Sequence, residues 1–130
     1  MDREQFKKRT KLLALRVIRL SQSLERSREA DVSGGQLLRS GTSIGANYRA
    51  ACRAKSTADY INKRKIVEEE ADETFYWLEL LVEAKIVPAA HLADLMKEVD
   101  EIVAMTVSSI KTLRSTSQGH PIHKPYETTS

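Results

Sequence analysis

The chain has 130 residues, of which 41% are hydrophobic and 30% are charged, and this length suits one domain with one hydrophobic core. It holds only two Phe and one Trp, so the core must consist mainly of Leu, Ile, Val and Ala, and five Gly with three Pro disfavour a loop-rich β-fold. The single cysteine, Cys52, excludes an internal disulfide, and no apolar run approaches the roughly 18 residues of a membrane span. We therefore expect a soluble, cytoplasmic protein.

The net charge of +3 is unevenly distributed along the chain. Residues 32–65 carry seven basic residues against Asp59 alone, whereas residues 66–84 carry seven acidic residues and no basic one. Such a basic segment can bind nucleic acid, or it can pair with the acidic segment of the same chain or of a neighbouring copy. Charged runs are also commonly no more than solvated helix faces, so these interpretations stay open.

The first predicted helix begins at Asp2, because Asp2 followed by Gln5 forms a capping-box pattern. It should end at about Ser27, before the segment DVSGG (31–35), where two adjacent glycines interrupt a helix. Its apolar positions recur at helical spacing and are Phe6, Leu13, Val17, Leu20 and Leu24.

Ser33, with Gln36 three residues later, predicts the start of a second helix. The inward face of this helix would consist of Leu37, Gly41, Ile44, Tyr48 and Cys52.

A third helix is predicted from near Thr57 to about Ala84, after the cap pattern of Ser56 and Asp59. Its apolar stripe consists of Tyr60, Val67, Ala71, Thr74, Leu78 and Leu81. The consecutive aromatics Phe75, Tyr76 and Trp77 cannot all face one core, so at least one points away from it. These three residues are candidates for a contact between subunits.

Pro88 predicts the start of a fourth helix, because the N–H that proline lacks is not needed there. A heptad-like stripe follows, made of Leu92, Leu95, Val99, Ile102, Thr106, Ile110 and Leu113. Beyond Arg114 the chain is polar, and residues 115–130 are expected to form a disordered tail. Residues 1–114 therefore predict an all-α, antiparallel, up-down-up-down four-helix bundle.

The segment RSGTSIGANYRAA (39–51) places two glycines inside the second helix. No Lys follows them before Lys55 and no strand precedes them, which disfavours a phosphate-binding loop. Gly41 and Gly45 instead lie one turn apart on one face, where they allow another helix to approach closely. Asn47 is expected to form a hydrogen bond within the bundle that fixes helix register, although an exposed, ligand-binding Asn is the alternative. The predicted helix-packing motif comprises Gly41, Ser43, Gly45 and Asn47.

Catalytic and metal-binding patterns are missing from the sequence. A di-iron bundle needs Glu-x-x-His on two helices, and none of His91, His120 and His123 lies three residues after a Glu. Cys52 has no histidine at helical spacing and suits a small core position. We therefore expect neither a metal or cofactor nor enzymatic activity.

Clustered Lys and Arg side chains are the best candidates for function, because they bind phosphates with salt-dependent and sequence-independent affinity. No aromatic residues are interleaved with them, as they are in single-strand binders. A membrane-surface role is disfavoured because the apolar face of the first helix is needed in the bundle. The candidate residues for binding RNA or DNA are Lys7, Lys8, Lys11, Arg39, Arg49, Arg53, Lys63 and Arg64.

The segment from about Leu37 to Leu81 resembles the four-helix-bundle proteins encoded in intervening sequences of 23S ribosomal RNA genes. The residues that carry this resemblance are Gln36, Arg39, Ser40, Ser43, Ile44, Asn47, Ser56, Glu69, Glu73, Trp77 and Leu78. Ala50 departs from the pattern, because many members have a Glu there.

The resemblance implies a four-helix bundle that assembles as a homopentameric ring. This pentameric bundle is also similar to the accessory variability proteins of diversity-generating retroelements, which partner a reverse transcriptase and bind nucleic acid through basic surfaces. The first hypothesis is therefore an oligomeric, non-enzymatic scaffold whose basic face binds nucleic acid. The alternative is a protein–protein adaptor, such as a reverse-transcriptase accessory protein, with no direct contact to nucleic acid.

Overall fold

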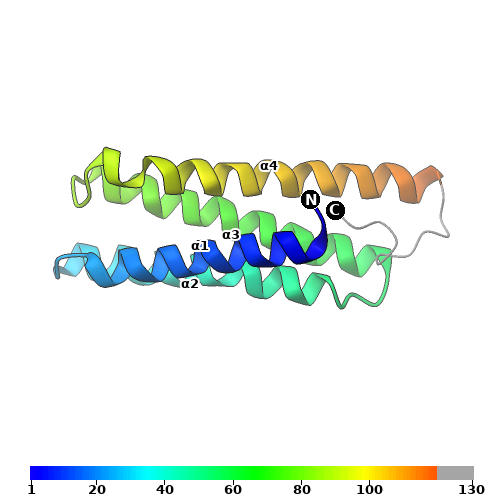
Figure 1. The fold of residues 1–130 in the computed structure, drawn as a ribbon, viewed down its shortest axis with the longest axis horizontal. Coiled ribbons are helices and arrows are strands. Elements are labelled where there is room, and N and C mark those ends of the chain that lie inside the picture. The colour runs from blue at the N-terminus through cyan, green and yellow to red at the C-terminus, as the bar shows by residue number, and fades with distance from the viewer. Residues whose placement is uncertain (120–130) are drawn as a thin grey trace.

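The computed structural model describes residues 1–119 and contains four α-helices. They are α1 (Arg3–Ser23), α2 (Arg28–Ala51), α3 (Thr57–Glu83) and α4 (Ala89–Gly119). Figure 1 shows them lying along one long axis, with the α1–α2 and α3–α4 loops at one end and the α2–α3 loop at the other. The predicted all-α, four-helix class is confirmed, and no strand occurs among the described residues.

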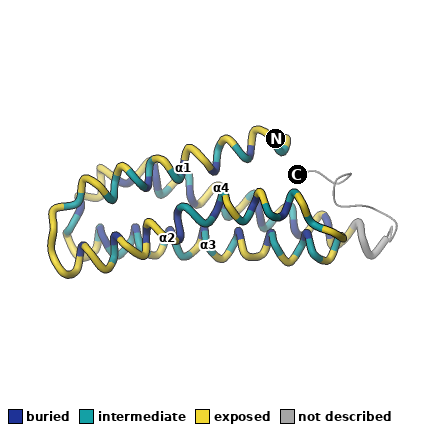
Figure 2. The backbone as a smooth tube through the Cα atoms, turned by 90° about the horizontal axis from the view of Figure 1, so that it is seen from below, coloured by how far each residue is buried: buried dark blue, intermediate teal, exposed yellow. Residues whose placement is uncertain are grey.

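The helices follow one another around the bundle. α2 packs against α1 and α3, and α3 packs against α4, whereas the backbones of α1 and α4 meet along a much smaller contact. α1 and α3 therefore lie diagonally opposite each other. Figure 2 shows buried positions recurring along each helix towards the shared interior.

The predicted apolar stripes form the core. Phe6, Leu13 and Val17 of α1 are buried, and Leu20 and Leu24 pack against the core from its edge. The α4 stripe from Leu92 to Leu113 is buried at every predicted position. Burial of this stripe stabilises α4 as a helix, since most helical stability in a folded protein comes from the packing of an apolar face.

Side-chain caps fix the starts of the first three helices. Asp2 and Gln5 form the predicted capping box, in which Asp2 Oδ1 accepts a hydrogen bond from Gln5 N at 2.8 Å. Ser56 caps α3 as predicted, with its Oγ accepting from Asp59 N at 3.1 Å. The end of α3 is a Schellman motif, in which Ile86 N donates to Leu81 O and Lys85 adopts a left-handed conformation with φ of 61°.

The predicted boundary between the first two helices is wrong. α1 ends at Ser23 and α2 begins at Arg28, so DVSGG lies inside α2. Ser27, rather than Ser33, is the N-cap, because its Oγ accepts from Ala30 N at 3.0 Å. Glu29 and Asp31 in the first turn also favour a helix start through the helix dipole.

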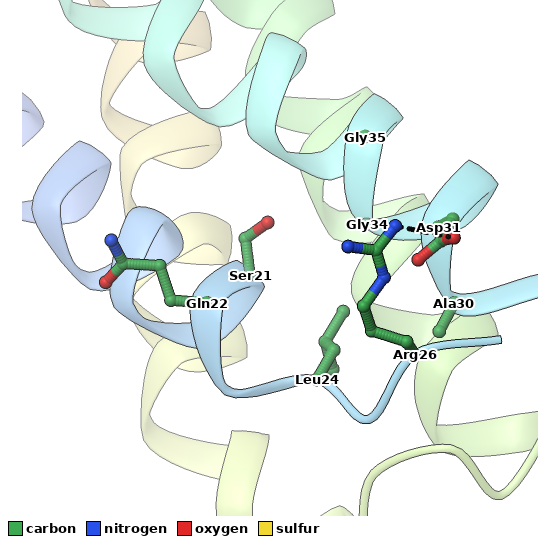
Figure 3. Close-up of a pocket in the computed structure, with 8 residues that line it drawn as sticks. All are labelled: Ser21, Gln22, Leu24, Arg26, Ala30, Asp31, Gly34 and Gly35. Atoms are coloured by element: carbon green, nitrogen blue, oxygen red, sulfur yellow. Dashed lines mark hydrogen bonds and ion pairs between the residues drawn. The ribbon is translucent and has the colours of Figure 1, made fainter.

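The two glycines of DVSGG occupy different environments within α2. A Cβ atom at position 34 would lie 2.9 Å from Leu24 Cδ1, whereas a Cβ at position 35 would meet nothing within 4 Å. Figure 3 shows Leu24 directed at this turn of α2 and Arg26 paired with Asp31 beside it. Gly34 thus lets the connecting loop pack closely on α2, which offsets the cost of glycine in a helix.

α4 continues to Gly119, so residues 115–119, which were expected in the tail, are helical. The rest of the expected tail, residues 120–130 with His120 and His123, lies outside the described residues.

Candidate nucleic-acid interface

Two adjoining hollows run along α1 and α2, and six of the thirteen residues that line them are basic. The first, of about 470 Å³, lies between the helices, with Lys7, Lys8 and Lys11 on one side and Arg49 on the other. The second, of about 430 Å³, shares Ala46 and Arg49 with the first and adds Ala50, Arg53 and Lys63. We call the two together the basic groove. It contains six of the eight predicted nucleic-acid-binding residues.

Small residues make the floor of the basic groove. A Cβ at position 45 would lie 3.1 Å from Thr10 Oγ1, so Gly45 allows α1 and α2 to approach closely, as predicted. Ala46 and Ala50 follow on the same side of α2 and add little height. The long Lys and Arg side chains therefore line the sides of a shallow groove whose base consists of small residues.

Four cations of the basic groove carry uncompensated charge. Lys7 Nζ lies 3.3 Å from Glu4 Oε1, and Lys63 Nζ lies 2.8 Å from both carboxylate oxygens of Asp59. The hydrogen bond from Lys63 holds the pKa of the Asp59 carboxyl below its ordinary value. Of the cations that line the basic groove, all of them within residues 1–119, Lys8, Lys11, Arg49 and Arg53 form no ion pair.

Arg39 lies outside the basic groove, on the surface between α2 and α3. Its guanidinium forms ion pairs with Glu70, at 3.2 Å, and with Glu73. Glu73 also accepts a hydrogen bond from Trp77 Nε1 at 3.1 Å, and this bond, with that from Arg39, lowers the pKa of Glu73. The acidic segment therefore pairs with a residue of the basic segment in the same chain, which was one of the open interpretations, and these carboxylates compensate the charge of Arg39.

Arg64 is buried, with only 1% of its surface exposed, so it is not available to phosphates of a bound nucleic acid. Its guanidinium carbon lies 5.2 to 5.6 Å from the ring centroids of Phe6, Tyr48 and Tyr60. Arg64 Nη1 also donates to Tyr60 Oη at 2.9 Å. Cation–π contacts therefore replace a carboxylate partner, and the prediction of Arg64 as a binding residue is wrong.

The segment 39–51 acts as a packing surface. Gly41 is buried against Val17, whose Cγ1 would lie 2.8 Å from a Cβ at position 41. Ser40, Thr42 and Ser43 each donate a hydrogen bond to a carbonyl one turn back in α2, which satisfies their hydroxyl groups within the helix.

Asn47 does not set register in the way predicted, because its Nδ2 donates to Ser43 O of its own helix at 2.8 Å. A buried hydrogen bond between two hydroxyl groups connects α3 to α2. In it, Thr74 Oγ1 donates to Ser40 Oγ at 3.0 Å. Sequence reasoning missed this pair, although both residues lie at core-facing positions of their helices.

The model of the 23S rRNA-intervening sequence protein family matches residues 3–108, which include all of α1 to α3 and most of α4. The chain belongs to this family. A solved structure of a protein of unknown function from the S23 ribosomal protein family of Bacteroides thetaiotaomicron is 39% identical to this chain. It matches with a TM-score of 0.79 and covers 85% of this chain and 99% of its own. No curated protein matches the chain.

The aromatic cluster of this family member divides as predicted. Tyr76 is 52% exposed, while Phe75 and Trp77 pack against the edge of the core. The Tyr76 and Trp77 rings meet edge to face, with centroids 5.1 Å apart. Tyr76 is therefore the member of the cluster that is available for a contact with another molecule.

Charge is segregated along the bundle axis, which the linear charge count does not reveal. The end that holds the α2–α3 loop is formed by residues 1–11, 46–66 and 104–114. It carries thirteen Lys and Arg against three Asp and Glu. The remaining described residues carry seven Lys and Arg against fourteen Asp and Glu. The basic groove lies at the basic end, where its electrostatic potential adds to that of the surrounding cations.

Two further observations concern residues 1–119. None of the helices there is both long and apolar enough to cross a membrane. In the same part of the chain, no three His, Cys, Asp or Glu side chains are arranged to hold a metal ion.

Proposed function

We propose that the protein is a non-enzymatic, homo-oligomeric scaffold that binds structured RNA or other nucleic acid through the basic groove. In this proposal the antiparallel four-helix bundle is the protomer of a homopentameric ring. The observation that carries the binding proposal is the alignment of Lys8, Lys11, Arg49 and Arg53, four unpaired cations, along one groove at the basic end of the molecule.

The groove lining favours contacts with the phosphate backbone. The lining contains no aromatic side chain for base stacking and no Asn or Gln side chain for reading base edges. Binding should therefore be independent of sequence and strongly dependent on salt. Neutralisation of four phosphates by four cations gives a slope of log affinity against log salt of about −3 to −4 for each protomer.

Fluorescence anisotropy of a labelled RNA hairpin, titrated at several salt concentrations, tests this proposal. We expect the double variant Arg49→Gln/Arg53→Gln to bind at least about tenfold more weakly and to lower the salt slope by about 2. The matched control is Arg26→Gln/Arg28→Gln, which removes the same charge at the opposite end and should bind like the parent.

Affinity that does not weaken with salt, or that falls equally in both double variants, would contradict binding in the groove. Absence of RNA binding by the parent would instead favour the adaptor function, in which the protein contacts another protein and no nucleic acid. Light scattering after size-exclusion chromatography tests the assembly, since a ring of five predicts a mass about five times the 14.7 kDa of one chain.

A further inference from the structure

The outer face of α1 carries two exposed leucines surrounded by cations. Leu12 is 53% exposed and Leu15 is 40% exposed, and neither joins the core. Their neighbours one turn away include Lys8, Lys11, Arg16 and Arg19. Residues 5–24 contain no acidic side chain. We call Leu12, Leu15, Arg16 and Arg19 the α1 stripe.

The outer face of α3 has the opposite charge around an exposed aromatic. Tyr76 is 52% exposed, and acidic residues lie one turn away on both sides of it. We call Glu69, Asp72, Tyr76 and Glu79 the α3 stripe. Within residues 1–119, none of its three carboxylates forms an ion pair.

The two stripes lie on opposite sides of the molecule, because α1 and α3 are diagonal in the bundle and both stripes lie on the helix faces away from the core. Each stripe has an apolar centre with charged flanks, which is the arrangement by which paired helices select a partner. A contact between two identical α1 stripes or two identical α3 stripes would place like charges together.

We propose that the α3 stripe of one copy docks on the α1 stripe of the next copy. This inference rests on the oligomeric part of the proposed function and assigns the two surfaces that build it. Because the two stripes are different surfaces, the contact is heterologous, and its repetition builds a ring where the rotation between neighbouring copies closes, instead of stopping at a two-fold dimer. A second copy fits both stripes, whereas a polyanion fits only the α1 stripe and is repelled by the α3 stripe.

Complementation between two variants tests the proposal. Leu12→Glu/Leu15→Glu damages only the α1 stripe, and Tyr76→Lys damages only the α3 stripe. All three positions are exposed, so both variants should retain the helical circular dichroism of the parent. The matched control is Val32→Glu, at a position that is 61% exposed and outside both stripes.

We expect each variant alone to have the mass of one chain by light scattering, and the control to keep the mass of the parent. An equimolar mixture should form a 1:1 heterodimer, because one intact α3 stripe meets one intact α1 stripe and neither chain can extend further. A mixture that stays monomeric would overturn the proposal.

Failure of this assignment can be distinguished from failure of the proposed function. If the parent is oligomeric and its mass is unchanged in both variants, the subunit contact lies elsewhere and only the assignment of the stripes is overturned. If the parent itself is monomeric, the oligomeric scaffold is overturned together with the stripes.

Discussion

Arg9 of α1 and Glu98 of α4 form a bidentate ion pair, with Arg9 Nε 2.6 Å from Glu98 Oε2 and Arg9 Nη2 2.8 Å from Glu98 Oε1. Arg9 Nη2 also lies 2.6 Å from Glu101 Oε1, and Arg9 Nη1 contacts the sulfur of Met105. The two helices share little direct backbone contact. Arg9 therefore closes the bundle along its most loosely packed seam.

Replacement of Arg9 by Met should lower the free energy of unfolding by about 1–3 kcal/mol at neutral pH, because charge-assisted bonds to half-buried carboxylates are lost. Chemical denaturation measures this change. Lys7→Met is the control, since Lys7 pairs only with the exposed Glu4 and its loss should have little effect.

The contribution of Arg9 should also depend on pH. The hydrogen bond from Arg9 holds the pKa of Glu98 below its ordinary value of 4.5. The stabilisation is therefore complete above the pKa of the unfolded carboxyl and is lost as the pH falls through the lower folded pKa. The stability difference between the parent and Arg9→Met should shrink below about pH 4.5. A difference that stays constant down to pH 2 would contradict this account.

Two glycines of α2 should respond oppositely to substitution by Ala. Gly41→Ala should destabilise by about 1–3 kcal/mol, because its Cβ would lie 2.8 to 3.1 Å from three atoms of the buried Val17, which cannot turn away. Gly35→Ala should stabilise by about 0.5–1 kcal/mol, because position 35 is open and helical. Thermal melts of both variants compare the two effects, and equal shifts would refute close packing at Gly41.

Lys85 adopts the left-handed conformation, which is strained for any residue that carries a Cβ atom and is unstrained for glycine. Lys85→Gly should stabilise the protein by about 0.5–1 kcal/mol, since the Schellman motif at the end of α3 favours glycine there. Lys85→Ala, which keeps a Cβ, serves as the control and should leave the melting temperature close to that of the parent. A gain of equal size in both variants would point to the loss of the Lys charge instead.

The burial of Arg64 predicts that it supports the fold and not the binding of nucleic acid. Arg64→Met keeps the volume of the side chain, so its RNA affinity should stay within about twofold of the parent. Arg64→Ala should lower the free energy of unfolding by about 2–5 kcal/mol through the cavity it leaves. An RNA affinity of Arg64→Met as weak as that of Arg49→Gln/Arg53→Gln would show that the guanidinium reaches the ligand.

Features that depend on neighbouring residues in the sequence were predicted well. The caps at Asp2 and Ser56 and the stripe of α4 follow from spacing alone. The boundary at Ser27 was missed because Gly34 appears as a helix breaker unless its contact with Leu24 is known. That contact belongs to the tertiary structure, and a local pattern does not contain it.

The candidate site shows the same division between local and tertiary information. The clustering of Lys7, Lys8 and Lys11 on one helix was evident from spacing, but whether a cation is exposed depends on the whole bundle. Arg64 lies four residues after Tyr60 and three before Val67, so its place on the buried stripe was the signal that could have excluded it. The partners of Arg39 required knowledge of which helices are adjacent.

The separation of charge between the two ends of the bundle affects how the protein meets a polyanion before any contact forms. A molecule with evenly mixed charge and the same net charge of +3 would arrive in random orientations. Here the electric field of the polyanion exerts a torque that turns the α2–α3 loop end towards it during diffusion. For the proposed binding of nucleic acid, the association rate should therefore be high and should fall steeply with ionic strength, while the dissociation rate should depend on the few cations that contact phosphate in the complex.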